Sequence, residues 1–222
     1  MVMPLDTDVI VRESLLVFGA LFPIVNPLGN ARIFLMLTRD VSSGARAAVS
    51  RRIAANGFIL LLVSIFIGTH ILAFFGISLP VVQVGGGMVV IATGWTLLHH
   101  AGEQEEQTHR RRTSTADASR MAFYPLTLPL TVGPGSISVA ITLGANRPES
   151  RPLTVSALAG ACIGAAAISL TILLCYRYAE RIARALGDTV MNVILRLSSF
   201  ILVCIGVQIV WNGASALLRS VK

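Results

Sequence analysis

Six long apolar stretches, separated by shorter polar segments, make up most of the chain. A membrane hydrocarbon core about 30 Å thick needs about 20 consecutive, mostly apolar residues for each helical span. The stretches meet this length, whereas membrane strands would need much shorter segments. We therefore predict an all-α, polytopic membrane protein with six transmembrane helices, over residues 9–37, 53–75, 79–99, 121–143, 153–176 and 193–218.

Two of these stretches, the first and the fourth, contain helix breakers near their centres. Proline lacks a backbone donor and clashes with the preceding turn, so it bends or ends a helix. Both stretches are therefore predicted to be broken helices, interrupted at Pro23, Pro27 and Gly29 in the first and at Pro129, Gly133, Pro134 and Gly135 in the fourth.

The two broken stretches share a pattern. The segments FPIVNPLGNARIF and LPLTVGPGSISVA align with one constant offset, which pairs Pro23 with Pro129, Gly29 with Gly135 and Asn30 with Ser136. Each half then has one broken helix followed by two ordinary helices. An odd number of spans per half makes the second half insert upside down, as in many secondary transporters.

This pattern predicts the organisation of the chain. We expect a single transmembrane domain of two inverted three-helix repeats with broken first helices. Residues 101–120 are polar and of mixed charge, so they are predicted to form a linker in water. The domain is 1–222, with repeat 1 at about 9–99, the linker at about 100–120 and repeat 2 at about 121–218.

The arginines predict the orientation in the membrane. With six spans, one side holds twelve of the eighteen basic residues, namely Arg39, Arg46, Arg51, Arg52, Arg110, Arg111, Arg112, Arg120, Arg177, Arg181, Arg184 and Arg196. The other side holds five, namely Arg12, Arg147, Arg151, Arg219 and Lys222. Basic residues concentrate in cytoplasmic loops, so the linker is predicted to be cytoplasmic and both termini periplasmic.

Composition agrees with the membrane class, with 54% hydrophobic residues, 13% charged residues and a mean hydropathy of +0.75. The net charge of +7 does not predict nucleic-acid binding, because the arginines lie between apolar stretches and form no single basic face. Cys162, Cys175 and Cys204 lie inside apolar stretches without CxxC spacing, so we predict no disulfide, metal site or cofactor.

The two breaks are the candidate binding site. Irregular backbone at membrane depth persists only where protein or a water-filled cavity bonds it, and paired breaks mark transporter sites. The half-helix that starts near Ser136 would present N–H groups to a carboxylate, and a facing half-helix end could take an ammonium group. The predicted site residues are Asn26, Gly29, Asn30, Thr131, Gly133, Gly135 and Ser136. The alternative is a pair of kinks whose amides only pack helices together.

Other polar and small residues are given structural roles. Gly160 and Gly164 have the GxxxG spacing of close helix contacts in membranes. Gln83 is predicted to bond between helices, and Arg32 is predicted to extend toward the cytoplasmic face. None of the six predicted spans has a deep Asp or Glu, which removes the usual carboxylate of a proton pump and argues against an enzyme.

FPIVNPLGN at 22–30 and PLTLPLTVGPGSIS at 125–138 resemble the MarC family of bacterial inner-membrane proteins. The likeness extends over nearly the whole chain and includes QIVWNG at 208–213. The resemblance implies a multi-pass protein of the bacterial inner membrane that transports a small neutral amino acid or a similar solute. Arg32, beside the first motif, departs from the small or apolar residue expected there.

The leading functional hypothesis is a secondary transporter of small solutes such as neutral amino acids. Its partners would be the lipid bilayer and a small-molecule solute, and a homo-oligomer is left open. The alternatives are a non-transporting membrane scaffold or stress-related accessory protein, and an exporter of unrelated metabolites. Substrate, direction and coupling ion do not follow from the sequence.

Overall fold

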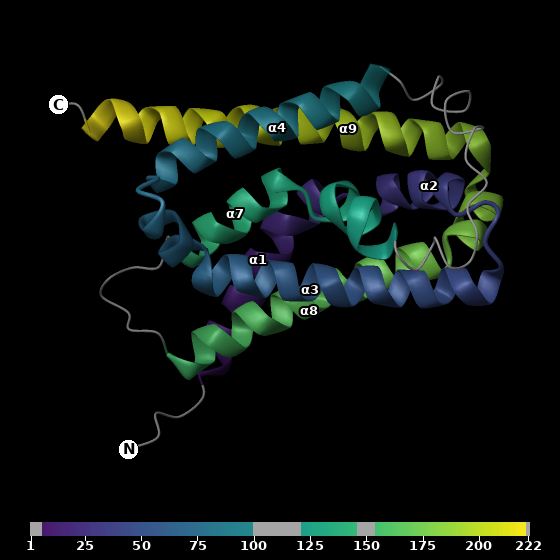
Figure 1. The fold of residues 1–222 in the computed structure, drawn as a ribbon, viewed down its shortest axis with the longest axis horizontal. Helices are drawn as coiled ribbons and strands as arrows, with labels where there is room; N and C mark the ends of the chain where they lie inside the picture. The colour runs from purple at the N-terminus through teal and green to yellow at the C-terminus, as the bar shows by residue number, and fades with distance from the viewer. Residues whose placement is uncertain (1–5, 100–120, 146–153, 221–222) are drawn as a thin grey trace.

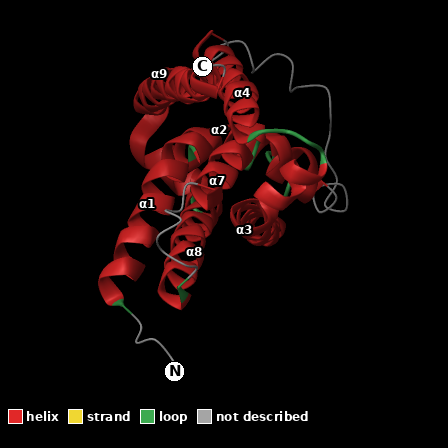
Figure 2. Cartoon of the chain, turned by 90° about the vertical axis from the view of Figure 1, so that its left-hand side faces the viewer, coloured by secondary structure: helices red, strands yellow, loops and turns green. Residues whose placement is uncertain are grey.

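The computed structural model describes residues 6–99, 121–145 and 154–220. The predicted linker at about 100–120 therefore lies outside the described residues. The described part of the chain consists of helices and connecting loops, without strands, which confirms the all-α class (Figure 2). The first half contains α1 Thr7–Val25, α2 Pro27–Leu37, α3 Ser43–Phe74 and α4 Leu79–His99; the second contains η2 Ala122–Thr131, α7 Pro134–Ala145, α8 Val155–Arg177 and α9 Ala179–Ser220.

Two helices extend well beyond the apolar stretches that predicted them. α3 begins ten residues before the predicted start, where the Ser42 side chain accepts a hydrogen bond from the Ala45 N–H. α9 begins at Ala179 instead of residue 193, with a kink at Gly187, where φ is 71°. The predicted starts were wrong because hydropathy detects the edge of the apolar region, whereas a polar helix can continue into water.

Four helices are long and apolar enough to cross a membrane, and a fifth span follows if the bent pair η2 and α7 counts as one. The axes of that pair differ by 68°. The first predicted span divides into α1, which has 19 residues and begins with charged side chains, and α2, which has only 11. Length and composition therefore support four or five spans, and six stays a prediction.

α3, α4 and α9 run roughly along the long axis of the view and α8 is inclined to them, with the broken segments between these helices (Figure 1). α4 lies against α9 on one side, and α3 lies against α8 on the other. α1 packs along α8, where Gly160 approaches Ile10 and Gly164 approaches Ser14. A Cβ at Gly164 would lie 2.8 Å from the Ser14 carbonyl oxygen, so the predicted close GxxxG contact is confirmed.

Glycines also bring the α4 and α9 backbones together. A Cβ at Gly87 would lie 2.8 Å from the Gly206 carbonyl oxygen, and one at Gly94 would lie 2.9 Å from the Ser199 carbonyl oxygen. Contacts of Gly87 with Gly206 and of Gly94 with Ser199 show that the two helices run antiparallel. Without water to drive helices together, such close packing is a main source of association in lipid.

Replacing Gly87 with Ala should destabilise the protein, although Ala is the better helix former. The new methyl group would meet backbone atoms of α9, and overpacking of this kind costs about 1–3 kcal/mol. For a chain of this size each kcal/mol lowers the unfolding midpoint by about 2–4 °C. Thermal unfolding in detergent measures the effect. Gly85→Ala is the control, because nothing lies within 4 Å of a Cβ at that position, and equal midpoints for the two variants would contradict the packing described.

Candidate functional site

The first break lies at Asn26, between α1 and α2. Its backbone has the left-handed angles φ 45° and ψ 57°, which Asn adopts more readily than most residues. Pro27 forces this change, because its ring disfavours helical geometry in the preceding residue. The Asn26 N–H donates to the Phe22 carbonyl at 3.0 Å, and Asn26 Oδ1 accepts from the Gly29 N–H at 3.2 Å. Asn26 thus ends one half-helix and caps the next.

Of the three predicted breakers in this stretch, only Pro27 lies directly at the break. Pro23 lies inside α1, and Gly29 lies in the first turn of α2. Gly29 is needed for a different reason, since a Cβ there would lie 2.5 Å from Asn26 Nδ2 and 2.9 Å from Asn26 Cγ. A larger residue would push the Asn26 side chain away from its cap.

The second break separates η2 from α7 at Val132 and Gly133. η2 is irregular because Tyr124 and Leu128, which precede Pro125 and Pro129, have extended backbone angles. The Thr131 hydroxyl donates to the Leu126 carbonyl at 2.7 Å and lies 2.8 Å from the Tyr176 hydroxyl.

The glycines of the second break allow close contacts. A Cβ at Gly133 would lie 2.9 Å from the Pro129 carbonyl oxygen, and one at Gly135 would collide with the Val90 side chain. Gly135 therefore lets α7 begin directly against α4. The break position matches that of the first half, since Val132 follows Asn26 by the same offset that aligned the two sequence segments.

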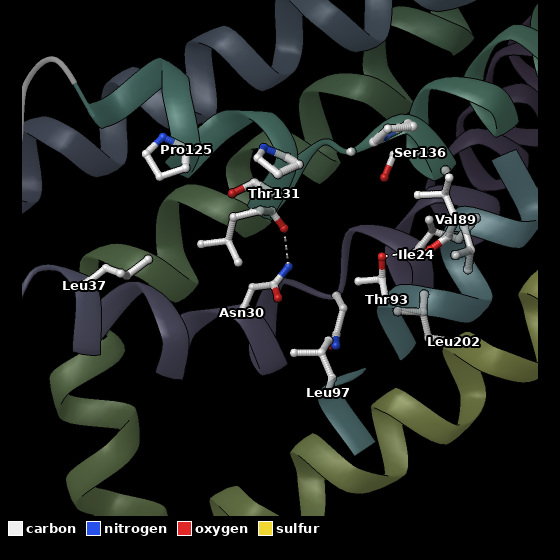
Figure 3. A pocket seen from close by; sticks show the side chains of 17 residues that line it. Ile24, Asn30, Leu37, Val89, Thr93, Leu97, Pro125, Thr131, Ser136 and Leu202 are labelled. Carbon is white, nitrogen blue, oxygen red and sulfur yellow. Dashed lines mark hydrogen bonds between the residues drawn. The ribbon is translucent and has the colours of Figure 1, made fainter. Parts of the chain in front are cut away.

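Asn30 joins the two breaks. Its Nδ2 donates to the Val25 carbonyl, the last of α1, and to the Leu130 carbonyl in η2, both at 2.9 Å. Figure 3 shows the bond to Leu130. One side chain thus donates to a carbonyl near the end of α1 and to a carbonyl near the end of η2. The backbone turns at Asn26, and Asn26 and Asn30 both line one space.

That space is a cavity of about 440 Å³ between the two breaks, α4 and α9. Apolar side chains cover most of its wall, among them Ile24, Val89, Val90, Leu97 and Leu202 (Figure 3). Six of the seven predicted site residues line it, namely Asn26, Asn30, Thr131, Gly133, Gly135 and Ser136. The seventh, Gly29, lies behind Asn26. The structure brings the residues together, and their role in binding stays a prediction.

Several hydrogen-bond donors without a protein partner in the described structure belong to residues that line the cavity. None of the described residues that line it has an ionisable side chain. The first backbone bond of α7 joins the Ile137 N–H to the Gly133 carbonyl at 3.1 Å, so the N–H groups of Gly135 and Ser136 precede the helical bonds. Asn26 is 6% exposed, and its Nδ2 has no hydrogen-bond partner within the described part of the chain.

Several wall residues were missed by sequence reasoning. Val89, Thr93 and Leu97 of α4 and Leu202 of α9 belong to ordinary apolar helices and carry no polar motif that could have marked them.

Two structural predictions for polar residues can also be checked. Gln83 Nε2 donates to Thr142 Oγ1 at 3.3 Å between α4 and α7, which confirms the predicted interhelical bond. Arg32 Nη1 donates to Asn192 Oδ1 of α9, an acceptor that the local sequence does not reveal. Whether Arg32 extends toward the cytoplasmic face stays a prediction.

Comparison with known proteins places the chain in a family. The model of the MarC family of integral membrane proteins matches residues 11–218. The chain belongs to the MarC family. The membrane protein YvbG of Bacillus subtilis is 31% identical over 201 residues, which cover 89% of this chain and 92% of YvbG. The membrane protein YhcE of Escherichia coli is 30% identical over 196 residues, covering 88% and 89% of the two chains.

The family assignment confirms the resemblance and identifies a multi-pass integral membrane protein. A third relative, the inner membrane protein MarC of Salmonella typhimurium, is 29% identical over 206 residues, covering 90% of this chain and 93% of the relative. No solved structure matches the chain significantly. The names of these relatives describe membrane proteins and state no solute.

Replacing Asn30 with Ala should destabilise this MarC-family protein. Two buried carbonyls would lose their donor, and each unsatisfied group costs about 1–3 kcal/mol. Thermal unfolding in detergent should show the loss. Gln208→Ala is the control, because Gln208 is exposed and donates to Asn212 one turn along the same helix at 2.9 Å. A variant at Asn30 as stable as the control would mean that water replaces both bonds.

Proposed function

We propose that this MarC-family protein is a secondary transporter of small zwitterionic solutes such as neutral amino acids. The observation that carries the proposal is the single cavity where two helix breaks meet. Its volume of about 440 Å³ falls within the range of about 300–1,000 Å³ that is typical of small-molecule sites. Transporters with broken helices bind their solutes at such places, near the middle of the membrane.

Helix packing supports two inverted repeats, with six spans if α1 and α2 count as one broken span. If the two halves are equivalent, α1 corresponds to η2 and α8 corresponds to α3. The contact of α1 with α8 should then have a counterpart between η2 and α3, and both contacts exist. The contact of α2 with α9 likewise corresponds to that of α7 with α4. α2 and α7 extend from the centre in opposite directions (Figure 1). Alternating access in such proteins comes from one repeat or bundle moving against another.

We further propose that the protein lies in the bacterial inner membrane with both termini periplasmic. The start of α3 and the junction of α8 with α9 lie at one end of the described structure, and the start of α1 and the end of α9 lie at the other (Figure 1). Arg46 and Glu180 form an ion pair of 3.2 Å at the first end, where Arg177 and Arg181 also lie. An arginine-rich end is typical of the cytoplasmic side.

Reporter fusions test this orientation. A reporter that is active only in the periplasm should be active when fused after Lys222 and silent when fused near Thr108. The expected result follows from twelve basic residues on the linker side against five on the other. The reverse pattern of activity would overturn the proposed orientation.

Transport itself is tested with purified protein in liposomes and a panel of radiolabelled neutral amino acids. Wild-type protein should move at least one of them, in uptake or efflux. Thr93→Phe should reduce this movement to the level of protein-free liposomes, because the ring would extend into the cavity. Thr93 and Thr96 are both exposed on α4 and both donate to the carbonyl one turn back at 2.8 Å, but only Thr93 lines the cavity.

Thr96→Phe is therefore the matched control and should transport normally. Equal inhibition by both substitutions would mean that the loss of transport does not depend on filling the cavity. A folded wild-type protein that moves no member of the panel in either direction would remove the proposed function and favour a non-transporting scaffold.

A further inference from the structure

We infer that the cavity recognises its solute through a carboxylate and a short apolar chain, and that the amino group is dispensable. Small monocarboxylates without an amino group would then bind, and amines without a carboxylate would not. This inference rests on the proposed function and names the chemical group on which binding depends. It follows from the donors and acceptors of the residues that line the cavity.

The Asn26 side chain has one defined orientation. Its Oδ1 accepts from the Gly29 N–H at 3.2 Å, so Nδ2 is the other arm of the amide. The absence of a Cβ at Gly29 allows this arrangement, because such an atom would lie 2.5 Å from Nδ2. Nδ2 lies on a residue that lines the cavity, is buried and has no partner among the described residues. A buried donor without a partner is costly, and an anionic oxygen would satisfy it.

The N-terminus of α7 supplies a second set of donors in the same cavity. α7 has 12 residues, and Gly133, Pro134, Gly135 and Ser136 all line the cavity. Pro134 has no N–H, so Gly135 and Ser136 present the first free amides. A helix N-terminus has a partial positive charge of roughly half a unit and commonly binds carboxylates and phosphates. A low-dielectric wall strengthens this attraction.

The acceptors near the breaks are largely occupied. The Val25 and Leu130 carbonyls accept from Asn30 Nδ2, and the Leu126 carbonyl accepts from the Thr131 hydroxyl at 2.7 Å. Asn30 Oδ1 is a neutral acceptor, and none of the described lining residues has a carboxylate. A desolvated ammonium group therefore finds no opposite charge.

The rest of the wall suits an alkyl chain. Val89, Val90 and Leu97 of α4 and Leu202 of α9 face the space beside the α7 N-terminus. Burying an alkyl chain there would favour binding through the hydrophobic effect. A cavity with hydrogen-bond donors at one end and apolar surface at the other matches a short-chain carboxylate, which has an anionic group and an alkyl chain.

Calorimetric binding to the purified, detergent-solubilised protein at pH 7 tests the inference with three probes of similar size. L-Alanine has both charged groups, propionate lacks the amine, and ethylamine lacks the carboxylate. Propionate should bind within about tenfold of L-alanine, whereas ethylamine should bind at least about a hundredfold more weakly, since it loses the charge-assisted bonds. Ethylamine binding as tightly as L-alanine, or propionate failing to bind where L-alanine binds, would overturn the inference.

Two variants locate the site. Asn26→Asp keeps an oxygen for the Gly29 N–H but replaces the free donor by an anion, so binding of L-alanine and propionate should fall at least about tenfold. Asn26→Gly, which adopts positive φ freely, removes the donor without adding charge and should weaken both ligands similarly. Asn56→Asp on α3 is the control, because Asn56 does not line the cavity. Unchanged binding in a folded Asn26→Gly protein would refute the role of Asn26.

The outcomes separate this inference from the proposed function. If amino acids are transported and ethylamine binds tightly, the proposed transport function stands and the inference of carboxylate selection is rejected. If propionate binds and no neutral amino acid is transported, the inference of carboxylate selection stands and the proposed transport function is rejected. Failure of all three probes to bind folded protein would overturn the inference whatever the transport result.

Discussion

The need to bond backbone groups away from water governs the centre of this protein. Two helices stop inside the apolar region, and an unbonded amide or carbonyl there costs several kcal/mol. Asn30 resolves the problem for both halves, because its two N–H bonds go to carbonyls at the ends of α1 and η2. The breaks must therefore lie side by side, and this contact positions α2, α7 and the cavity between them.

The cavity wall depends on close packing elsewhere. Glycines let α4 and α9 approach at backbone distance, and this helix pair closes the side of the cavity opposite the breaks. Gly135 lets α7 begin directly against Val90 of α4. Glycine thus has two structural roles here, because it allows close helix contacts and permits irregular backbone. A site built this way is rigid at its base and apolar on its walls.

In the proposed site, recognition would rely on fixed dipoles instead of charged side chains. Asn26 Nδ2 and the first amides of α7 are the free donors that the structure identifies, and the described lining residues include no acid or base. Neutral donors attract an anion without the cost of burying a permanent charge. This arrangement is consistent with a MarC-family protein whose predicted spans lack a deep carboxylate.

The sequence by itself determined the helical class, the approximate spans and both break positions, because apolar length and proline act locally along the chain. It also identified six residues that line the cavity, since an internal repeat marks equivalent positions. Tertiary structure alone decided that Asn30 bonds to the opposite half, that Arg32 bonds to Asn192, and that Val89 and Leu202 form the wall. These contacts join segments far apart in the chain, and no local pattern of apolar and polar residues specifies which distant partner a side chain meets.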